Sequence, residues 1–264
     1  MSNPVHLSII TPAFKGAHYL ESCLKNVADQ WVPGIEHVVV DGGSTDGTVE
    51  ILQTFSAKYG HISWVSEKDN GQSNAMNKGI AMAKGKWISF LNVDDFYEPD
   101  ILPRIVQFSK DPHNQGKILV GNLNILQPNG TLKQVNKPAH MRLSLLLADI
   151  CEWPYNPSAY FYPKAIHAQI GNFPENEHYA MDYDFILKAA THGIAFKYFN
   201  ETWGNFRLLP EAKTSTDQAA NTSYERSAQL RKHYKTKLTP IQKIEVDLLI
   251  FYWRVRNFIL SRLK

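Results

Sequence analysis

Residues 87–95 read Trp87-Ile88-Ser89-Phe90-Leu91-Asn92-Val93-Asp94-Asp95, and they join a short apolar run to two adjacent carboxylates. The run from Trp87 to Phe90 predicts a buried strand. Carboxylates at the end of such a strand are costly to bury unpaired, and the usual compensation is a cation. Oxygen ligands of this kind suit Mg²⁺ or Mn²⁺, so Asn92, Asp94 and Asp95 indicate a metal site. The alternative is that the two acids only cap the helix that follows.

Strands and helices alternate over the first hundred residues. Their periodicity predicts strands at 7–11, 38–41, 62–66 and 87–91, with helices at 19–30, 48–58 and 74–84. This repetition with short links predicts an α/β fold with a mostly parallel central sheet flanked by helices. In such sheets the ligand crevice lies outside the carboxyl ends of the strands. Four polar residues should therefore share one rim: Thr11, Asp41, Glu67 and Asp94.

The second half of the chain changes in character. Two apolar runs at 118–126 and 132–135 flank a Pro-Asn-Gly turn, which predicts a β-hairpin. Helices are expected at 141–147 and 182–192, and a strand at 195–199. A polar stretch at 211–223 predicts a linker, and a long helix should run from 240 to 264.

Composition narrows the class of protein. The chain has 264 residues, a hydrophobic content of 44% and a formal net charge of +3, so a packed core is available and no nucleic acid partner is expected. Cys23 and Cys151 form neither a disulfide framework nor a metal-ligand spacing, which suits the cytosol. The sequence begins without a signal-peptide pattern, and it contains no run of 18 apolar residues.

The segment from Asp41 to Thr48, DGGSTDGT, is the second strong signal. Its glycines permit a tight turn, and the turn opens a helix N-terminus, where backbone amides favour anions. The segment matches neither a dinucleotide-binding glycine motif nor a P-loop. Asp41 could accept hydrogen bonds from a base or ribose; the alternative is an Asx-type turn with a helix cap.

Two further groups of charged residues are candidates for chemistry. Asp182 and Asp184 flank the start of an apolar helix, where an acid either stabilises the helix dipole or acts as a general base. Arg207 and Lys213 either clamp a diphosphate or are ordinary surface charges.

These segments together resemble family 2 glycosyltransferases, which are inverting enzymes of the GT-A fold. The resemblance covers residues 5 to 215 and rests on five motifs in the family's order. They are Ser8 to Phe14, Asp41 to Thr48, Glu67 to Gly79, Leu91 to Asp95, and Met181 to Phe185.

The resemblance implies a role for each candidate residue. The uridine of a UDP-sugar would contact Thr11, Pro12, Asp41, Ser44 and Asp69. Asp94 would lie near the ribose or the donor sugar. Asp95 would bind Mn²⁺ or Mg²⁺, and Arg207 would contact the phosphates. Asp182 would be the base that deprotonates the acceptor hydroxyl.

The implied enzyme moves a sugar to a hydroxyl of a glycan or lipid-linked glycan, with inversion, in the synthesis of bacterial surface polysaccharides. The implied GT-A catalytic domain is 1–215, with a nucleotide-binding half at 1–100 and an acceptor half at 101–215. Residues 216–264 would form a C-terminal helical extension. Two alternatives remain open, a nucleotidyltransferase of related fold and a non-catalytic nucleotide-sugar-binding protein.

The C-terminal helix lies outside the resemblance. Arg254, Arg256, Arg262 and Lys264 are basic, and no acidic residue follows Asp247. We hypothesise a helix that lies on the inner membrane surface, which would suit a cytoplasmic enzyme with a lipid-linked acceptor. The alternative is packing on the catalytic domain or on a second copy in a homodimer. The apolar stripe behind both expectations comprises Ile241, Ile244, Leu248, Leu249, Tyr252, Val255, Ile259 and Leu263.

Overall fold

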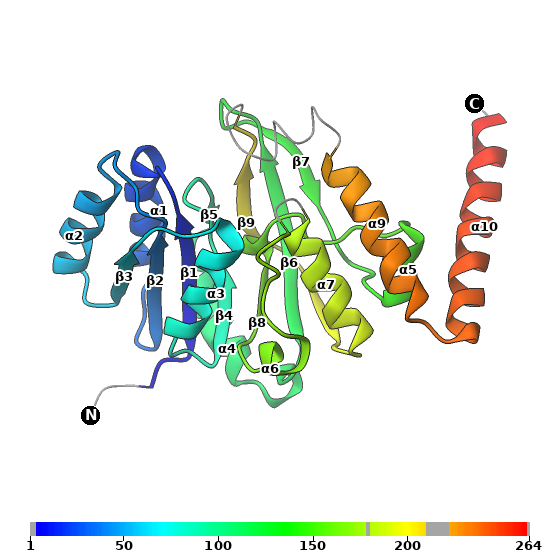
Figure 1. The fold of residues 1–264 in the computed structure, drawn as a ribbon, viewed down its shortest axis with the longest axis horizontal. Helices are drawn as coiled ribbons and strands as arrows, with labels where there is room; N and C mark the ends of the chain where they lie inside the picture. The colour runs from blue at the N-terminus through cyan, green and yellow to red at the C-terminus, as the bar shows by residue number, and fades with distance from the viewer. Residues whose placement is uncertain (1–3, 178–179, 210–221, 263–264) are drawn as a thin grey trace.

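A computed structural model describes residues 4–177, 180–209 and 222–262 of the chain. Its described residues form one nine-stranded sheet with helices on both faces (Figure 1). The strand order is β3-β2-β1-β4-β8-β6-β9-β5, and β7 pairs with β6. The strands are β1 Leu7–Ala13, β2 Ile35–Asp41, β3 Ile62–Ser66, β4 Trp87–Phe90, β5 Phe96–Tyr97, β6 Ile118–Leu126, β7 Leu132–Asn136, β8 Tyr160–Pro163 and β9 Phe196–Arg207.

The first four strands are parallel, as the alternating pattern predicts. β1 lies between β2 and β4 and pairs parallel with both, and β2 pairs parallel with β3. Their carboxyl ends therefore meet at one edge of the sheet, which we call the rim. The remaining strands are of mixed direction, because β8 runs antiparallel to β4 and β6 while β9 runs parallel to β6.

Alternate residues of these strands fill two separate cores. Ile10, Val38 and Phe90 belong to the core that contains α3, α5 and α7. Leu7 and Trp87 belong to the opposite core, which contains α1 and α4. Both faces of the sheet are therefore buried around β1, β2 and β4, which explains the apolar runs in these strands. The helices are α1 Ala17–Asp29, α2 Thr48–Lys58, α3 Gln72–Met82, α4 Ile101–Lys110, α5 Leu143–Ala148, α6 Ile166–Ile170, α7 Met181–Thr191, α9 Thr222–Thr236 and α10 Pro240–Arg262, with 3₁₀ turns η1 Pro112–Asn114 and η2 Pro157–Ala159.

Strand β9 extends well beyond the predicted 195–199 and reaches Arg207. Its central part is polar and its pairing with β6 is irregular, with register shifts around Asn122. At this irregularity the ring of Trp203 on β9 packs directly against Gly121 on β6. A Cβ added to Gly121 would lie 2.3 Å from the Trp203 side chain. Apolar alternation stops at Phe199, so periodicity alone could not follow the strand to the rim.

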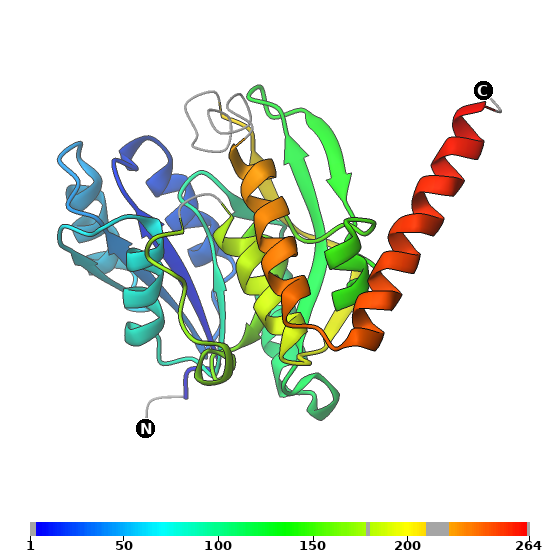
Figure 2. The same cartoon turned by 45° about the vertical axis from the view of Figure 1, so that its right-hand side comes forward.

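The C-terminal region contains two helices of different character. α9, which the sequence patterns did not predict individually, contacts α5 and α7. α10 contacts α5 and then projects away from the other elements (Figures 1 and 2). Within the described ranges, no helix is both long and apolar enough to cross a membrane. The expected linker at 211–223 lies outside the described residues except for its last two, which begin α9.

Candidate active site

The turn after β2 is organised by the carboxylate of Asp41, which is fully buried. Its Oδ2 accepts hydrogen bonds from the amides of Gly43 (3.1 Å) and Ser44 (2.9 Å) and from the hydroxyl of Ser66 (2.6 Å). Gly43 has φ +83°, a conformation that favours glycine. This is the Asx-type turn that the sequence left as an alternative. It holds the backbone of the Gly42–Ser44 segment at the rim, and a contact from Asp41 to uridine remains a prediction.

The turns after β1 and β2 are tied together. The Lys15 amide donates to Ser44 Oγ (2.7 Å), and the Ala17 amide donates to Asp46 Oδ2 (3.1 Å). The Gly16 amide donates to Thr48 Oγ1 (3.0 Å). Ser44 and the start of α2 are thus fixed against the loop that leads into α1, which preorganises the rim.

Thr11 and Pro12 lie inside β1, and both are buried. The Thr11 hydroxyl is 2.8 Å from Nε2 of His37 on the neighbouring strand, so its polar group is already used within the sheet. The sequence predicted Thr11 at the end of its strand, but β1 continues to Ala13, so Thr11 lies inside the strand with its hydroxyl facing inward. Its contact with uridine remains a prediction.

The buried His37 makes stability depend on pH. Burial and the nearby His61 lower the pKa of His37 from 6.5 to about 3. The folded state holds His37 neutral while the unfolded chain protonates it below pH 6.5, so this stabilisation is present above that pH and is lost as the pH falls. We expect the contribution of His37 to the free energy of unfolding to fall by about 2 kcal/mol between pH 7 and pH 5.

Urea unfolding at both pH values tests this expectation in the wild type and in His37→Asn. The variant removes the titrating ring, so its stability should change less with pH than that of the wild type. The same pH slope in both proteins would contradict the assignment to His37.

Asp69 follows β3 and meets the turn after β2. Its Oδ1 accepts a hydrogen bond from the Gly71 amide at 2.8 Å. A Cβ added to Gly42 would lie 2.7 Å from Asp69 Oδ2, so only glycine allows this approach. The structure therefore brings together Asp41, Ser44 and Asp69, which come from two separate segments of the sequence.

Asp94 and Asp95 lie at the end of β4, as the sequence predicts, but their surroundings differ. Asp95 is 1% exposed. Its Oδ2 accepts hydrogen bonds from the side-chain amides of Asn92 (3.0 Å) and Asn156 (2.7 Å), and its Oδ1 accepts one from the Arg207 amide (3.2 Å). Asp94 is half-buried.

Burial disfavours the negative charge on both carboxyl groups. Burial and the neighbouring Asp94 carboxylate raise the pKa of Asp95 well above its ordinary value. Burial also raises the pKa of Asp94, although the positive charge of Arg207 opposes this. Two adjacent acids with raised pKa values favour an added cation, and their oxygens are donors that Mg²⁺ and Mn²⁺ prefer. The residues therefore fit a divalent ion.

The protein would supply only part of such an ion's coordination shell. Among residues 4–177, 180–209 and 222–262, no group of three or more His, Cys, Asp or Glu side chains is arranged to hold a metal. Mg²⁺ is commonly bound by one or two carboxylates together with substrate phosphates and water. The pair thus fits a site that is completed by a diphosphate.

Arg207 lies beside the acidic pair. Its guanidinium donates to the backbone oxygen of Asp94 (2.7 Å) and lies over the Phe96 ring at 4.6 Å. This places a fixed positive charge at the rim, 112 residues in sequence from Asp95. Lys213, its predicted partner in a diphosphate clamp, lies outside the described residues.

Asp182 lies in the first turn of α7 and accepts a hydrogen bond from Tyr160 Oη at 2.9 Å. Burial and the Asp182 charge raise the pKa of Tyr160 well above 10, so the phenol stays neutral and donates. The N-terminus of α3 links this region to the acidic pair. Gln72 donates to the Asn92 side chain (3.2 Å), and Ser73 donates to the sulfur of Met181 (3.7 Å).

The neighbouring Asp184 has a structural role. It is 5% exposed, accepts a hydrogen bond from Tyr234 Oη (2.6 Å) and forms an ion pair with Lys188 (2.9 Å). The Tyr234 contact attaches α9 to α7, and the Lys188 contact lies within α7. Asp182 and Asp184 both lie at the start of α7, so their position in the sequence does not tell them apart. Their partners in the structure do.

Asn156 is a site residue that sequence reasoning missed. It is 2% exposed, and its Oδ1 accepts hydrogen bonds from the amide and the hydroxyl of Ser158, which orients its Nδ2 toward Asp95. The segment Trp153–Ser158 is conspicuous in sequence for its aromatic and turn residues. Trp153 packs on the core ring of Tyr183 at 4.7 Å.

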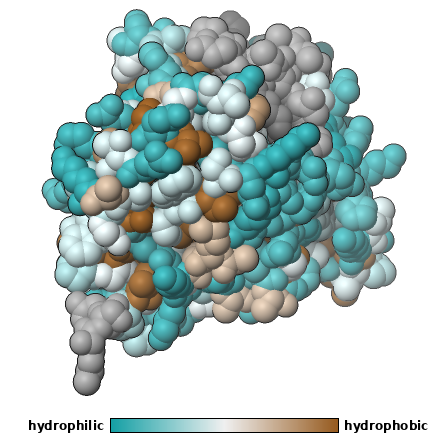
Figure 3. All heavy atoms as spheres, turned by 60° about the vertical axis from the view of Figure 1, so that its left-hand side comes forward, coloured by the Kyte–Doolittle hydropathy of each residue, from teal (hydrophilic) through white to brown (hydrophobic). Residues whose placement is uncertain are grey.

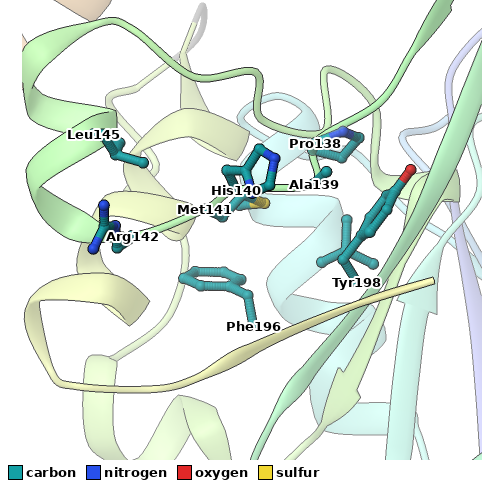
Figure 4. A pocket seen from close by; sticks show the side chains of 9 residues that line it. Pro138, Ala139, His140, Met141, Arg142, Leu145, Phe196 and Tyr198 are labelled. Atoms are coloured by element: carbon teal, nitrogen blue, oxygen red, sulfur yellow. The ribbon is translucent and has the colours of Figure 1, made fainter. Parts of the chain in front are cut away.

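A pocket of about 270 Å³ lies away from the acidic pair, under the segment before α5 (Figure 4). Side chains from this segment and from the start of β9 line it, with His140, Arg142 and Tyr198 as its polar members. None of the residues predicted to bind donor or metal belongs to it.

Comparisons with known proteins agree on the family. The chain is 30% identical to Escherichia coli chondroitin synthase over 212 residues, which are 79% of this chain and 30% of the relative. It is 31% identical to a Mycobacterium tuberculosis PGL/p-HBAD biosynthesis glycosyltransferase over 186 residues, which are 69% of this chain and 68% of the relative. The chain thus spans less than a third of the length of the chondroitin synthase.

Solved structures agree on the fold. S. aureus TarS 1-349 in complex with UDP-GlcNAc has a TM-score of 0.72 at 19% identity, covering 98% of this chain and 74% of that one. The mannosyltransferase PcManGT from Pyrobaculum calidifontis, in complex with GDP-Man and Mn²⁺, has a TM-score of 0.59 at 16% identity, covering 95% and 80%. These likenesses confirm the predicted α/β glycosyltransferase fold of the GT-A type. Because the family model "Glycosyl transferase family 2" matches residues 8–147, more than half of the chain, this protein belongs to glycosyl transferase family 2.

Proposed function

We propose that this glycosyltransferase moves a sugar from a UDP-sugar to a hydroxyl of a glycan or lipid-linked glycan, with inversion at the anomeric carbon. The observation that carries the proposal is the convergence at one rim of a preorganised turn, an acidic pair and a cation. The turn contains Asp41 and Ser44, the pair is Asp94 and Asp95, and the cation is Arg207.

The donor would lie across the rim. The Gly42–Ser44 backbone and Asp69 would contact the uridine, because the two lie against each other at the ends of β2 and β3. Thr11 and Pro12 would support this end from β1. Asp94 would face the ribose or donor sugar, and Arg207 would contact the diphosphate.

Mn²⁺ or Mg²⁺ would be held by Asp95 with help from Asp94, and when bound it would neutralise the charge that develops on the departing UDP. Asn92 and Asn156 hold the Asp95 carboxylate in place through two hydrogen bonds. We regard Asn156 as a positioning residue, because it acts through Asp95. The side-chain oxygen of Asn156 in turn accepts a hydrogen bond from the Ser158 amide.

Asp182 would act as the general base. Its carboxylate would take the proton of the acceptor hydroxyl as that oxygen bonds to the anomeric carbon. The bond between the anomeric carbon and the β-phosphate oxygen would break on the opposite face, which inverts the configuration in one displacement. Tyr160 orients the carboxylate. The exposed ring of Tyr155 lies next to Asn156 in sequence and offers a surface on which an acceptor sugar could stack.

The biological setting is part of the same proposal. The named relatives act in chondroitin synthesis and in PGL/p-HBAD biosynthesis, which supports an acceptor from surface glycan assembly. We place the reaction in the cytoplasm at the inner membrane surface, where lipid-linked acceptors are accessible. The division into a catalytic domain at 1–215 and an extension at 216–264 belongs to this proposal.

A nucleotide panel tests donor class and metal dependence together. We expect UDP, at about 100 times its Kd, to raise Tm by about 5 °C, with a larger shift when Mn²⁺ is present. GDP, ADP and CDP at the same concentration should give smaller shifts. Thermal unfolding with and without Mn²⁺ measures this, and Mn²⁺ alone is the control. An equal response to all four nucleotides would contradict a UDP-sugar donor.

A further inference from the structure

Helix α10 presents an apolar face that the described part of the protein leaves uncovered. Ile241 is 80% exposed, Phe251 67% and Phe258 55%. The opposite side of the helix docks on the body, where Val246 is 1% exposed and Leu249 and Ile250 pack against the main core. The six residues of this face, called the α10 stripe, are Ile241, Ile244, Leu248, Phe251, Val255 and Phe258.

The stripe is continuous along the helix and faces away from the protein. Its members recur at alternating spacings of three and four residues, which places them on one side of an α-helix. Figures 1 and 2 show that the last turns of α10 lie away from every other element. On the face formed by the N-terminal half, exposed apolar residues are instead scattered among hydrophilic ones (Figure 3). A large continuous apolar surface marks an interaction site.

The charge around the stripe identifies the partner. Successive residues of a helix are rotated by about 100°, so Arg254 and Arg256 fall on opposite edges of the stripe. Asp247, which is paired with Lys235 of α9, lies on the same edge two turns before Arg254, and no acidic residue follows it, while Arg262 lies at the end of the described helix. Apolar faces edged by arginine, with Tyr and Trp nearby, are typical of helices that lie in the headgroup region of anionic membranes.

A second copy of the chain fits this surface less well. A two-stranded coiled coil has a narrow apolar seam with charged residues at its edges. Here Tyr252 and Ile259, exposed by 66% and 52%, widen the apolar face on one side. We propose that the α10 stripe binds the surface of a membrane that contains anionic lipids, with Arg254 and Arg256 contacting lipid phosphates. This rests on the proposed placement at the inner membrane surface, names the surface that makes the contact, and does not depend on the donor.

Vesicle binding of the full chain tests the proposal. Co-sedimentation uses phosphatidylcholine vesicles with and without about a third of phosphatidylglycerol, and we expect binding chiefly to the anionic vesicles. Phe251→Ser/Phe258→Ser should weaken binding about a hundredfold, because it removes two aromatic anchors. Arg254→Gln/Arg256→Gln should weaken binding to the anionic vesicles about thirtyfold.

The matched control is Leu132→Ser/Tyr224→Ser, which removes two exposed apolar residues outside α10 and should bind like the wild type. Circular dichroism and Tm establish that each variant is folded. Absence of binding to anionic vesicles, or equal binding by the wild type and the Phe251→Ser/Phe258→Ser variant, would overturn the proposal. The proposal would also be overturned if the wild type bound no vesicles but dimerised without lipid, and if the Phe251→Ser/Phe258→Ser variant abolished that dimer. Sedimentation measures the dimerisation. Because the assay contains no nucleotide, its outcome is separate from that of the UDP panel.

Discussion

Asp182→Asn should lower the rate of sugar transfer by about 10²–10⁴-fold, the range expected when a general base is removed. The amide keeps the size of the carboxylate and can still accept a hydrogen bond from Tyr160, but it cannot take the proton of an acceptor hydroxyl. UDP affinity should be unchanged, because Asp182 is not among the proposed donor contacts. The rate is measured as UDP release with a donor and acceptor selected from a sugar-nucleotide and glycan panel.

The matched control is Asp184→Asn, which makes the same change two residues along α7. Asp184 is tied to Tyr234 and Lys188, so this variant should lose thermal stability and keep its rate at temperatures where it is folded. The base assignment would be wrong if Asp182→Asn retained a rate within threefold of the wild type, or if both variants lost activity equally.

Asp95→Asn should remove the additional UDP stabilisation by Mn²⁺ and lower the transfer rate by about 10²–10³-fold. The physical reason is electrostatic. The carboxylate is buried beside Asp94 with a raised pKa, so it is a site where a cation is favoured and where charge on a leaving diphosphate can be offset. Calorimetric titration of UDP with and without Mn²⁺ measures the first effect.

Asp100→Asn is the control for Asp95→Asn. This exposed residue has φ +61°, which asparagine tolerates, and it lies five positions along the chain. The variant should keep both the Mn²⁺ effect and the rate. An unchanged Mn²⁺ effect in Asp95→Asn would show that the ion does not bind at the acidic pair.

Several elements could be predicted from local sequence, because local sequence controls them. The bounds of α2 and β3 agree with the prediction, and β1, β2, α1 and α3 were placed within a few residues. Their apolar periodicity and flanking glycines are short-range signals. Cys23 lies on the buried face of α1, and burial raises the pKa of its thiol to about 12.

Other elements depend on partners distant in sequence. β8 is four residues long, and it is a strand because β4 and β6 pair with it on either side. α9 has few apolar residues of its own, and it is anchored through Leu230 and Tyr234. Periodicity could predict neither of them, since their stabilising contacts come from tertiary packing.

The sequence by itself determined the alternating α/β order, the turn that begins at Asp41 and the acidic pair at the end of β4. Each depends on residues close together in the chain. Only the tertiary structure decided how the pair is held. Asn156 and Arg207 reach Asp95 because η2 with β8, and β9, bring segments 61 and 112 residues away to the same rim, and no local pattern contains such a contact.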